Sequence, residues 1–263
     1  RSDIETKTDR LRGLNVLKCR QRLQVNEEVQ TLFNTMRQSK DIPAQLMAMF
    51  VRVDRKLFVP EKERKNCNKE DRPISLNYGV SLSAPHIHIY ALKQFEHLLS
   101  ARNGGKSDVA FLDVGCGTGY VCTLMAVGFV MNSTNNNRFK SYGCVYNPHL
   151  WKQAEAARDA LGLHKFVEYK QATTNMMDIG WKGKAPFDGI YCGAAITESD
   201  CDSLRLQLKV NGYLMCVVEK SQEPKKQVMR LVKRTKIGKS GNSVDSDFVV
   251  KDLFDVMFRT LRG

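Results

Sequence analysis

The feature that most restricts the fold of this chain is a glycine-rich turn at residues 115–119, which directly follows an apolar run at 109–114. The apolar run is typical of a buried strand, and the residues after Tyr120 follow a helical pattern. Glycine at every second position lets the backbone turn sharply and approach a ligand closely, at the N-terminus of the next helix. The spacing departs from the dinucleotide-binding fingerprint, which needs a further glycine three residues after the second. The stretch predicts a strand, a ligand-binding turn and a helix, although an apolar strand that simply ends in a glycine turn would give the same letters.

Strands and helices alternate on either side of this turn. The expected strands are 109–114, 141–146, 166–169, 187–192 and 213–218, and the expected helices between them are 120–130, 148–161 and 200–208. Helical spacing also marks 27–37, 43–53 and 86–100, whereas 61–71 is a polar loop and 248–261 is strand-like. This alternation predicts an α/β fold with a doubly wound, mostly parallel sheet. Ligands of such sheets bind beyond the carboxyl ends of the strands, where the glycine turn falls.

We divide the chain into three parts on this pattern. Residues 1–25 form a basic extension that we expect to order only against a partner, 26–100 form a helical segment with a substrate-side loop, and 101–263 form the Rossmann-like domain. Hydrophobic residues make up 42% of the chain, so a packed core is expected. Apolar runs are too short to span a bilayer, and no membrane partner is predicted.

The eight cysteines are expected to be free thiols. None of them forms a Cys-x-x-Cys pair, and Cys116, Cys144, Cys192 and Cys216 fall in or beside expected core strands. Free buried thiols favour a reducing intracellular compartment. The chain begins with Arg1 rather than methionine, so we expect a processed product. With the basic charge, this favours the mitochondrial matrix over the cytoplasm.

A formal net charge of +13 favours a polyanionic partner, and RNA is the partner that we predict. The charge concentrates in the 1–25 extension and in Lys220–Lys239, where eight basic residues stand against one acid. A phosphate-contacting face would explain this cluster. A solvated basic surface that binds no nucleic acid would explain it equally well.

A second motif carries a resemblance to a known family. Residues 79–92 contain Ser-Ala-Pro-His-Ile-His, and Val-Asp-Arg at 53–55, Phe-Val-Pro-Glu at 58–61 and Gly-Ala-Ala at 193–195 occur in the matching order. This set resembles the protein-L-isoaspartate O-methyltransferases over roughly residues 26–262, and Gln227 stands where that family has a glutamine. The Asp-x-Gly-x-Gly-x-Gly turn resembles the first motif of S-adenosylmethionine-dependent methyltransferases.

The resemblance implies a seven-stranded sheet that binds S-adenosylmethionine and transfers its methyl group to an isoaspartyl carboxylate of a damaged protein. Ser83 would hold the substrate carboxylate, and His86 would support the loop rather than act as a base, because a carboxylate is already ionised at neutral pH. His86 and His88 could suggest a metal site, but no third ligand is placed near them, so no metal is predicted. The implied cofactor residues are Asp113, Gly115, Cys116, Gly117, Thr118, Gly119, Tyr146, Asn147, Ala172 and Thr173, and the implied substrate residues are Ser83, Ala84, Gly193 and Ala194.

The chain departs from the family pattern at three positions. Tyr146 stands where the family has an acid that grips the ribose, 171–173 has no acid near the adenine position, and Glu219 replaces a glycine. Losing charge-assisted hydrogen bonds costs on the order of 1.5–3 kcal/mol, or roughly tenfold to a hundredfold in affinity. Two interpretations therefore stay open: an active methyltransferase, and a weakly active or inactive relative in an RNA–protein complex such as a mitochondrial ribosome.

Overall fold

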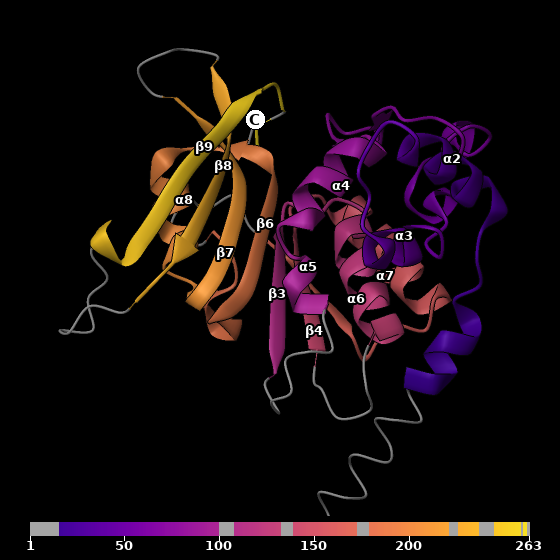
Figure 1. Cartoon of the computed structure of the whole chain (residues 1–263), viewed down its shortest axis with the longest axis horizontal. Helices are drawn as coiled ribbons and strands as arrows, with labels where there is room; N and C mark the ends of the chain where they lie inside the picture. The colour runs from indigo at the N-terminus through magenta and orange to yellow at the C-terminus, as the bar shows by residue number, and fades with distance from the viewer. Residues whose placement is uncertain are drawn as a thin grey trace, which may run out of the picture.

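The computed structural model describes residues 16–99, 108–132, 139–172, 179–220, 226–236, 245–258 and 260–261. Its main element is a seven-stranded sheet of order β5-β4-β3-β6-β7-β8-β9 (Figure 1). The strands are β3 (Val109–Val114), β4 (Phe139–Val145), β5 (Val167–Gln171), β6 (Phe187–Ile196), β7 (Leu208–Glu219), β8 (Gln227–Arg234) and β9 (Phe248–Val256). Strands β3 to β7 pair in parallel, and β8 runs antiparallel to both of its neighbours. The predicted doubly wound, mostly parallel sheet is confirmed.

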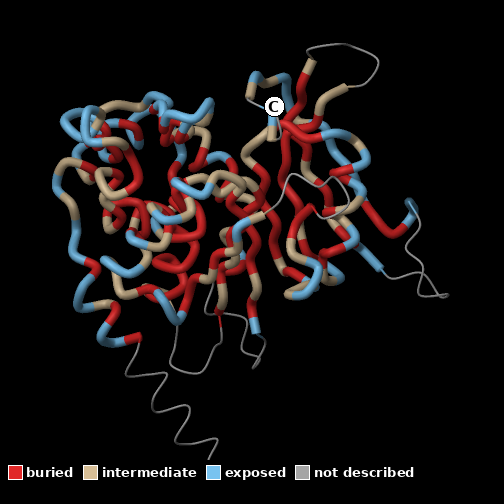
Figure 2. Tube along the Cα trace, turned by 180° about the vertical axis from the view of Figure 1, so that it is seen from behind, coloured by how far each residue is buried: buried red, intermediate tan, exposed pale blue. Residues whose placement is uncertain are grey.

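Helices cover both faces of the sheet. Figure 1 shows α2 to α7 gathered on one side and α8 on the other. Their bounds are α2 (Glu27–Arg37), α3 (Ala44–Phe50), α4 (Pro85–Lys93), α5 (Glu96–Leu99), α6 (Tyr120–Asn132), α7 (Pro148–Ala160) and α8 (Glu198–Arg205). Because side chains alternate along a strand, Phe111 packs with the α6 side, while Leu112 and Val114 pack with the α8 side. The buried residues of Figure 2 therefore run through the strands and both adjoining layers.

Helix α6 is apolar on nearly all sides because it lies between α3 and the sheet. The expected helix at 86–100 is interrupted, since α4 ends at Lys93 and α5 begins at Glu96. The expected helix at 200–208 begins earlier, because Thr197 and Asp200 form a capping box at its N-terminus. Within the described residues, no helix is long and apolar enough to cross a membrane.

Short elements complete the chain. A small hairpin joins β1 (Ile74–Ser75) to β2 (Ser81–Leu82). The 3-10 helices are η1 (Arg55–Phe58), η2 (Glu61–Glu63), η4 (Lys182–Lys184) and η5 (Asp245–Asp247). The basic region around 220–239 contributes β8, and the strand-like region at 248–261 contributes β9.

The described part of the N-terminal extension packs on the chain itself. Residues 16–22 form a helix, and Val16, Cys19 and Leu23 are buried. The Arg20 guanidinium donates to the carbonyl of Val130 at 2.6 Å, at the end of α6. Our expectation that the extension orders only against a partner is therefore wrong for residues 16–25, because an apolar stripe at helical spacing buries against α6 and α7. Residues 1–15 lie outside the described part.

Candidate active site

A cavity of about 1020 Å³ lies beyond the carboxyl ends of β3, β4 and β6. Five separate stretches of the chain line it, drawn from residues 73–88, 113–121, 145–150, 191–194 and 256–261. It brings together these residues singled out in the sequence: Ser83, Ala84, His86, Asp113, Gly115, Cys116, Gly117, Thr118, Tyr146, Asn147, Gly193 and Ala194. The position agrees with the rule that parallel sheets bind ligands at this edge.

The glycine turn has the left-handed backbone that only glycine adopts readily. The φ angles are +74° at Gly115, +55° at Gly117 and +82° at Gly119. The amides of Gly115 and Cys116 both donate to the carbonyl of Cys144 at 3.0 Å, which fixes the start of the turn on β4. A Cβ on Gly117 would meet only Leu76 at an ordinary 3.7 Å, so this glycine leaves open space in the cavity.

Two of the predicted cofactor residues, Gly119 and Ala172, do not line the cavity. Gly119 packs against Tyr169, whose hydroxyl donates to the Gly119 carbonyl at 3.3 Å, and a Cβ on Gly119 would collide with that hydroxyl. Gly119 therefore contributes to the conformation of the turn through its packing against Tyr169 and not as a lining residue. Ala172 is half-buried, and its amide donates to the carbonyl of Val145, a residue that does line the cavity. Thr173 lies outside the described residues.

Ser83 and His86 sit at the entrance to α4. The His86 amide and ring Nδ1 both contact Asp71 Oδ1, at 3.0 and 2.9 Å. Partial burial acts to raise the pKa of Asp71, but the hydrogen bonds from His86 outweigh it and the pKa is lowered. The buried Arg55 donates weakly to the Ser83 carbonyl at 3.4 Å, and more strongly to Cys67 at 2.8 Å. These contacts hold His86, in the first turn of α4, against Asp71.

Buried polar groups with no hydrogen-bond partner among the described residues also line the cavity. They are His88 Nδ1 and the hydroxyls of Tyr120 and Tyr191. Burial, with smaller contributions from Arg55 and His86, lowers the pKa of His88 to about 3, and burial raises the pKa of both phenols. The sequence analysis missed both tyrosines, although Tyr191 stands directly before the flagged Gly-Ala-Ala.

The cavity is poor in carboxylates. Among the described residues that line it, Asp113 is the sole acid, and burial raises its pKa to about 8. At the end of β4, Tyr146 lines the cavity without a charge. The Asn147 side-chain oxygen caps α7 by accepting from the amides of His149 and Leu150, at 2.9 and 3.3 Å. That oxygen is therefore committed to the helix and does not replace the missing acid.

The C-terminal segment closes one side of the cavity, which the sequence analysis did not anticipate. The Leu261 amide donates to the Ala195 carbonyl at 2.9 Å, and a Cβ on Gly115 would lie 2.5 Å from Leu261 Cδ1. Gln227 on β8 holds the same segment, because its side chain accepts from the Phe258 amide at 2.6 Å and donates to the Phe258 carbonyl at 3.1 Å. The glutamine flagged in the sequence therefore positions residues of the cavity wall.

Comparisons with known proteins agree with this arrangement. The family model for protein-L-isoaspartate(D-aspartate) O-methyltransferase matches residues 27–261. This chain belongs to that family. It is 32% identical to protein-L-isoaspartate O-methyltransferase 1 of Arabidopsis thaliana over 63% of its own length and 66% of the relative. It is also 32% identical to the protein-L-isoaspartate O-methyltransferase of Ignicoccus hospitalis, over 79% of its length and 84% of the relative.

Solved structures show the same fold at lower identity. One, described as a putative protein-L-isoaspartate O-methyltransferase from Plasmodium falciparum in complex with S-adenosyl-L-homocysteine, covers 91% of this chain and all of its own, with a TM-score of 0.66 and 22% identity. Another protein-L-isoaspartate O-methyltransferase gives a TM-score of 0.68 at 16% identity, over 88% of this chain and 65% of its own. These two structures support the fold of the family member described here.

The basic residues of β8 are largely engaged within the molecule. Arg230 forms ion pairs with Glu198 on α8 and Asp252 on β9, and Lys220 pairs with Asp252. Arg234 is buried and donates to the carbonyls of Leu206 and Leu208. Lys225 and Lys239 lie outside the described residues. Part of the predicted cationic face therefore forms ion pairs and hydrogen bonds that hold the end of the sheet together.

Proposed function

We propose that this protein transfers a methyl group from S-adenosylmethionine to the side-chain carboxylate of an isoaspartyl residue in a damaged protein. The observation that carries the proposal is the meeting of two sequence motifs in one cavity. The Ser83–His88 segment and the Gly115–Thr118 turn are about thirty residues apart in the chain, yet both line it. Family membership over residues 27–261 gives the reaction class.

The residues present suit the methionine end of the cofactor. Gly115 and Gly117 are cavity-lining positions where a side chain would be strained by a positive φ. Tyr120 and Tyr191 line the cavity, and their hydroxyls have no hydrogen-bond partner among the described residues. When bound, S-adenosylmethionine supplies an activated methyl group on a sulfonium.

The protein's own side chains then have little covalent work to do. The acceptor carboxylate is ionised at neutral pH and needs no base, so the chain contributes alignment and exclusion of water. Ser83 is half-buried at the cavity and orients the acceptor through its hydroxyl. His86, bonded to Asp71, holds the loop that carries Ser83.

The ribose end fits less well, because Tyr146 is uncharged and the Asn147 oxygen caps α7. We therefore expect cofactor binding that is weaker than a carboxylate grip would give, by roughly tenfold to a hundredfold. We therefore expect a working enzyme whose cofactor affinity is reduced at the ribose.

The test is calorimetric titration of the full chain with S-adenosylmethionine, followed by transfer of labelled methyl to an isoaspartyl peptide. The same peptide with ordinary aspartate is the substrate control. Gly117→Val is expected to weaken binding by at least about tenfold. Gly183→Val is the matched control, because a Cβ on Gly183 meets nothing within 4 Å.

Ser83→Ala provides a second variant that does not strain the turn. It is expected to lower methyl transfer while leaving the heat of cofactor binding in place. Absence of binding at millimolar cofactor, or equal labelling of both peptides, would overturn the proposal.

RNA binding through Lys220–Lys239 stays a prediction that rests on net charge alone. The pairing of Arg230 and Lys220 with acids reduces the charge available for phosphates.

A further inference from the structure

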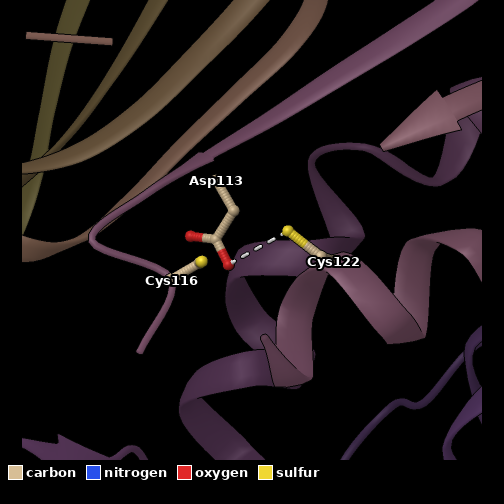
Figure 3. Close-up of side chains that lie close together, drawn as sticks. All are labelled: Asp113, Cys116 and Cys122. Carbon is tan, nitrogen blue, oxygen red and sulfur yellow. Dashed lines mark hydrogen bonds between the residues drawn. The ribbon is translucent and has the colours of Figure 1, made fainter. Parts of the chain in front are cut away.

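Two thiols and a buried carboxylate converge beneath the glycine turn. Asp113 ends β3, Cys116 lies in the turn, and Cys122 lies in the first turn of α6 (Figure 3). One ligand atom from each of the three lies within 4.8 Å of the others, and Cys122 Sγ lies 3.8 Å from Asp113 Oδ2. Neither the family resemblance nor the proposed methyl transfer uses this cluster as a unit.

The cluster is held rigidly by the backbone around it. The Cys116 amide is fixed on the Cys144 carbonyl, and the Cys122 thiol also contacts the Tyr142 carbonyl at 3.4 Å. A Cβ on Gly143 would lie 2.7 Å from Cys116 Sγ, so the glycine on β4 makes room for that sulfur. The positions of both sulfurs are thus determined by β4 as well as by their own segment.

Asp113 has no cation to balance it. Its side chain is 2% exposed and contacts a thiol, and no ion pair joins it to a basic side chain in the described part of the chain. A buried carboxyl without a cation partner is kept protonated by its surroundings, and a bound cation would stabilise its ionised form. Asp113 and Cys116 nevertheless line the cavity, so a small cation can reach them without unfolding of the protein.

We propose that Asp113, Cys116 and Cys122 form a binding site for a thiophilic divalent cation, such as Zn²⁺ or Cd²⁺, on the floor of the cavity. Two sulfurs and one carboxylate oxygen suit such ions. Tetrahedral zinc with bonds to sulfur of about 2.3 Å separates two sulfurs by about 3.8 Å, which is within the spread of the three ligand atoms. Asp113 and Cys116 line the cavity, whereas Cys122 is fully buried, so any further ligand, such as water, would have to come from the cavity side. Each thiol and the Asp113 carboxyl lose their protons to solvent as the ion binds.

The test is titration of the full, metal-free chain with Cd²⁺ in the presence of a phosphine reductant. Binding is measured by the ultraviolet charge-transfer absorption band of cadmium thiolate. The unchanged chain is expected to bind one ion at this site. In Cys116→Ser and in Cys122→Ser, the affinity is expected to fall at least about tenfold, and about one proton fewer is released per ion. Zn²⁺ is expected to displace Cd²⁺ and remove the band.

Cys201→Ser is the matched control. Cys201 and Cys216 form a second buried thiol pair, 3.7 Å apart, but neither residue lines the cavity. Affinity that is unchanged in Cys116→Ser and Cys122→Ser, or lost equally in Cys201→Ser, would refute the site. Thermal unfolding of each variant verifies folding, and the half-buried turn position of Cys116 makes its serine variant the one that should fold best. The titration needs no S-adenosylmethionine, so its result is independent of the proposed methyl transfer.

Discussion

Among single residues, Tyr146 and Asn147 after β4 determine which polar groups the cavity offers to a ribose. Tyr146 lines the cavity, while the oxygen of Asn147 is used to cap α7. A capping oxygen satisfies amide groups that would otherwise lack partners at a helix N-terminus, so it is not released cheaply. Asn147 therefore does not replace the carboxylate that is missing at Tyr146.

Restoring a carboxylate at this position should strengthen nucleotide binding. Tyr146→Glu is expected to lower the dissociation constant of S-adenosylhomocysteine by roughly tenfold, since a charged acceptor makes stronger hydrogen bonds with ribose hydroxyls. Calorimetry measures the change. Tyr146→Gln keeps a similar reach without the charge, and an equal gain in that variant would show that the charge is not the cause.

His88 should make the folded state sensitive to acid. Its pKa is lowered to about 3 by burial, against about 6.5 for an unperturbed histidine. As the pH falls below about 6.5, the unfolded chain takes up this proton and the folded chain does not, so stability present above that pH is lost. Between pH 7 and 4.5 we expect the loss from this group to be roughly 2–3 kcal/mol.

Urea unfolding at the two pH values, for the unchanged chain and for His88→Gln, isolates that contribution. The variant should lose less stability on acidification by about this amount. His149→Gln, in the exposed first turn of α7, is the control for removing an imidazole. An equal difference in both variants would contradict the assignment to His88.

Among the elements, β8 connects α8 to β9 through side-chain contacts. Arg230 is nearly buried and bonds to Asp252 on β9 at 2.6 Å, as well as to Glu198 on α8. These bonds, with Lys220, lower the pKa of Asp252 to about 2 although partial burial opposes them. Through Gln227, the same strand also holds Phe258 in the cavity wall.

Arg230→Gln is expected to lower the free energy of unfolding by roughly 1–2 kcal/mol, because it leaves Glu198 without its cation and Asp252 with Lys220 alone. The expected loss of stability is small because solvent screens both partly exposed carboxylates. Lys236→Gln, at an exposed position beyond the end of β8, should change stability little. Chemical denaturation of both variants measures the difference, and equal effects would mean that net charge rather than the Arg230 contacts is responsible.

In the whole molecule, the first and last strands of the large sheet both lead into segments that line the cavity. The glycine turn follows the first strand of the large sheet, and residues 256–261 return from its last strand to cover that turn. The Leu261 side chain lies against Gly115, and its amide is bonded to Ala195. The wall therefore depends on strands that are far apart in sequence.

Leu261→Ala is expected to weaken S-adenosylhomocysteine binding severalfold and to lower the free energy of unfolding by about 1 kcal/mol, because it removes apolar wall and leaves a gap. Leu206→Ala, at a side chain that is 51% exposed, is the control. Calorimetry and denaturant unfolding give the two quantities. Unchanged ligand affinity in Leu261→Ala would show that the C-terminal segment does not enclose the ligand.

Residue patterns were enough to predict the local elements and the resemblance to the family. Alternating apolar runs placed the strands and helices, and the Gly115–Gly119 turn and the Ser83–His88 segment placed two walls of the cavity, because periodicity, glycine and short motifs act over a few residues. The three-dimensional structure was needed to see that Leu261 lines the cavity and that the Asn147 oxygen caps α7. It was also needed to see that Cys122 lies close to Cys116 and Asp113. These contacts depend on strand order and side-chain direction, and spacing along the chain carries neither.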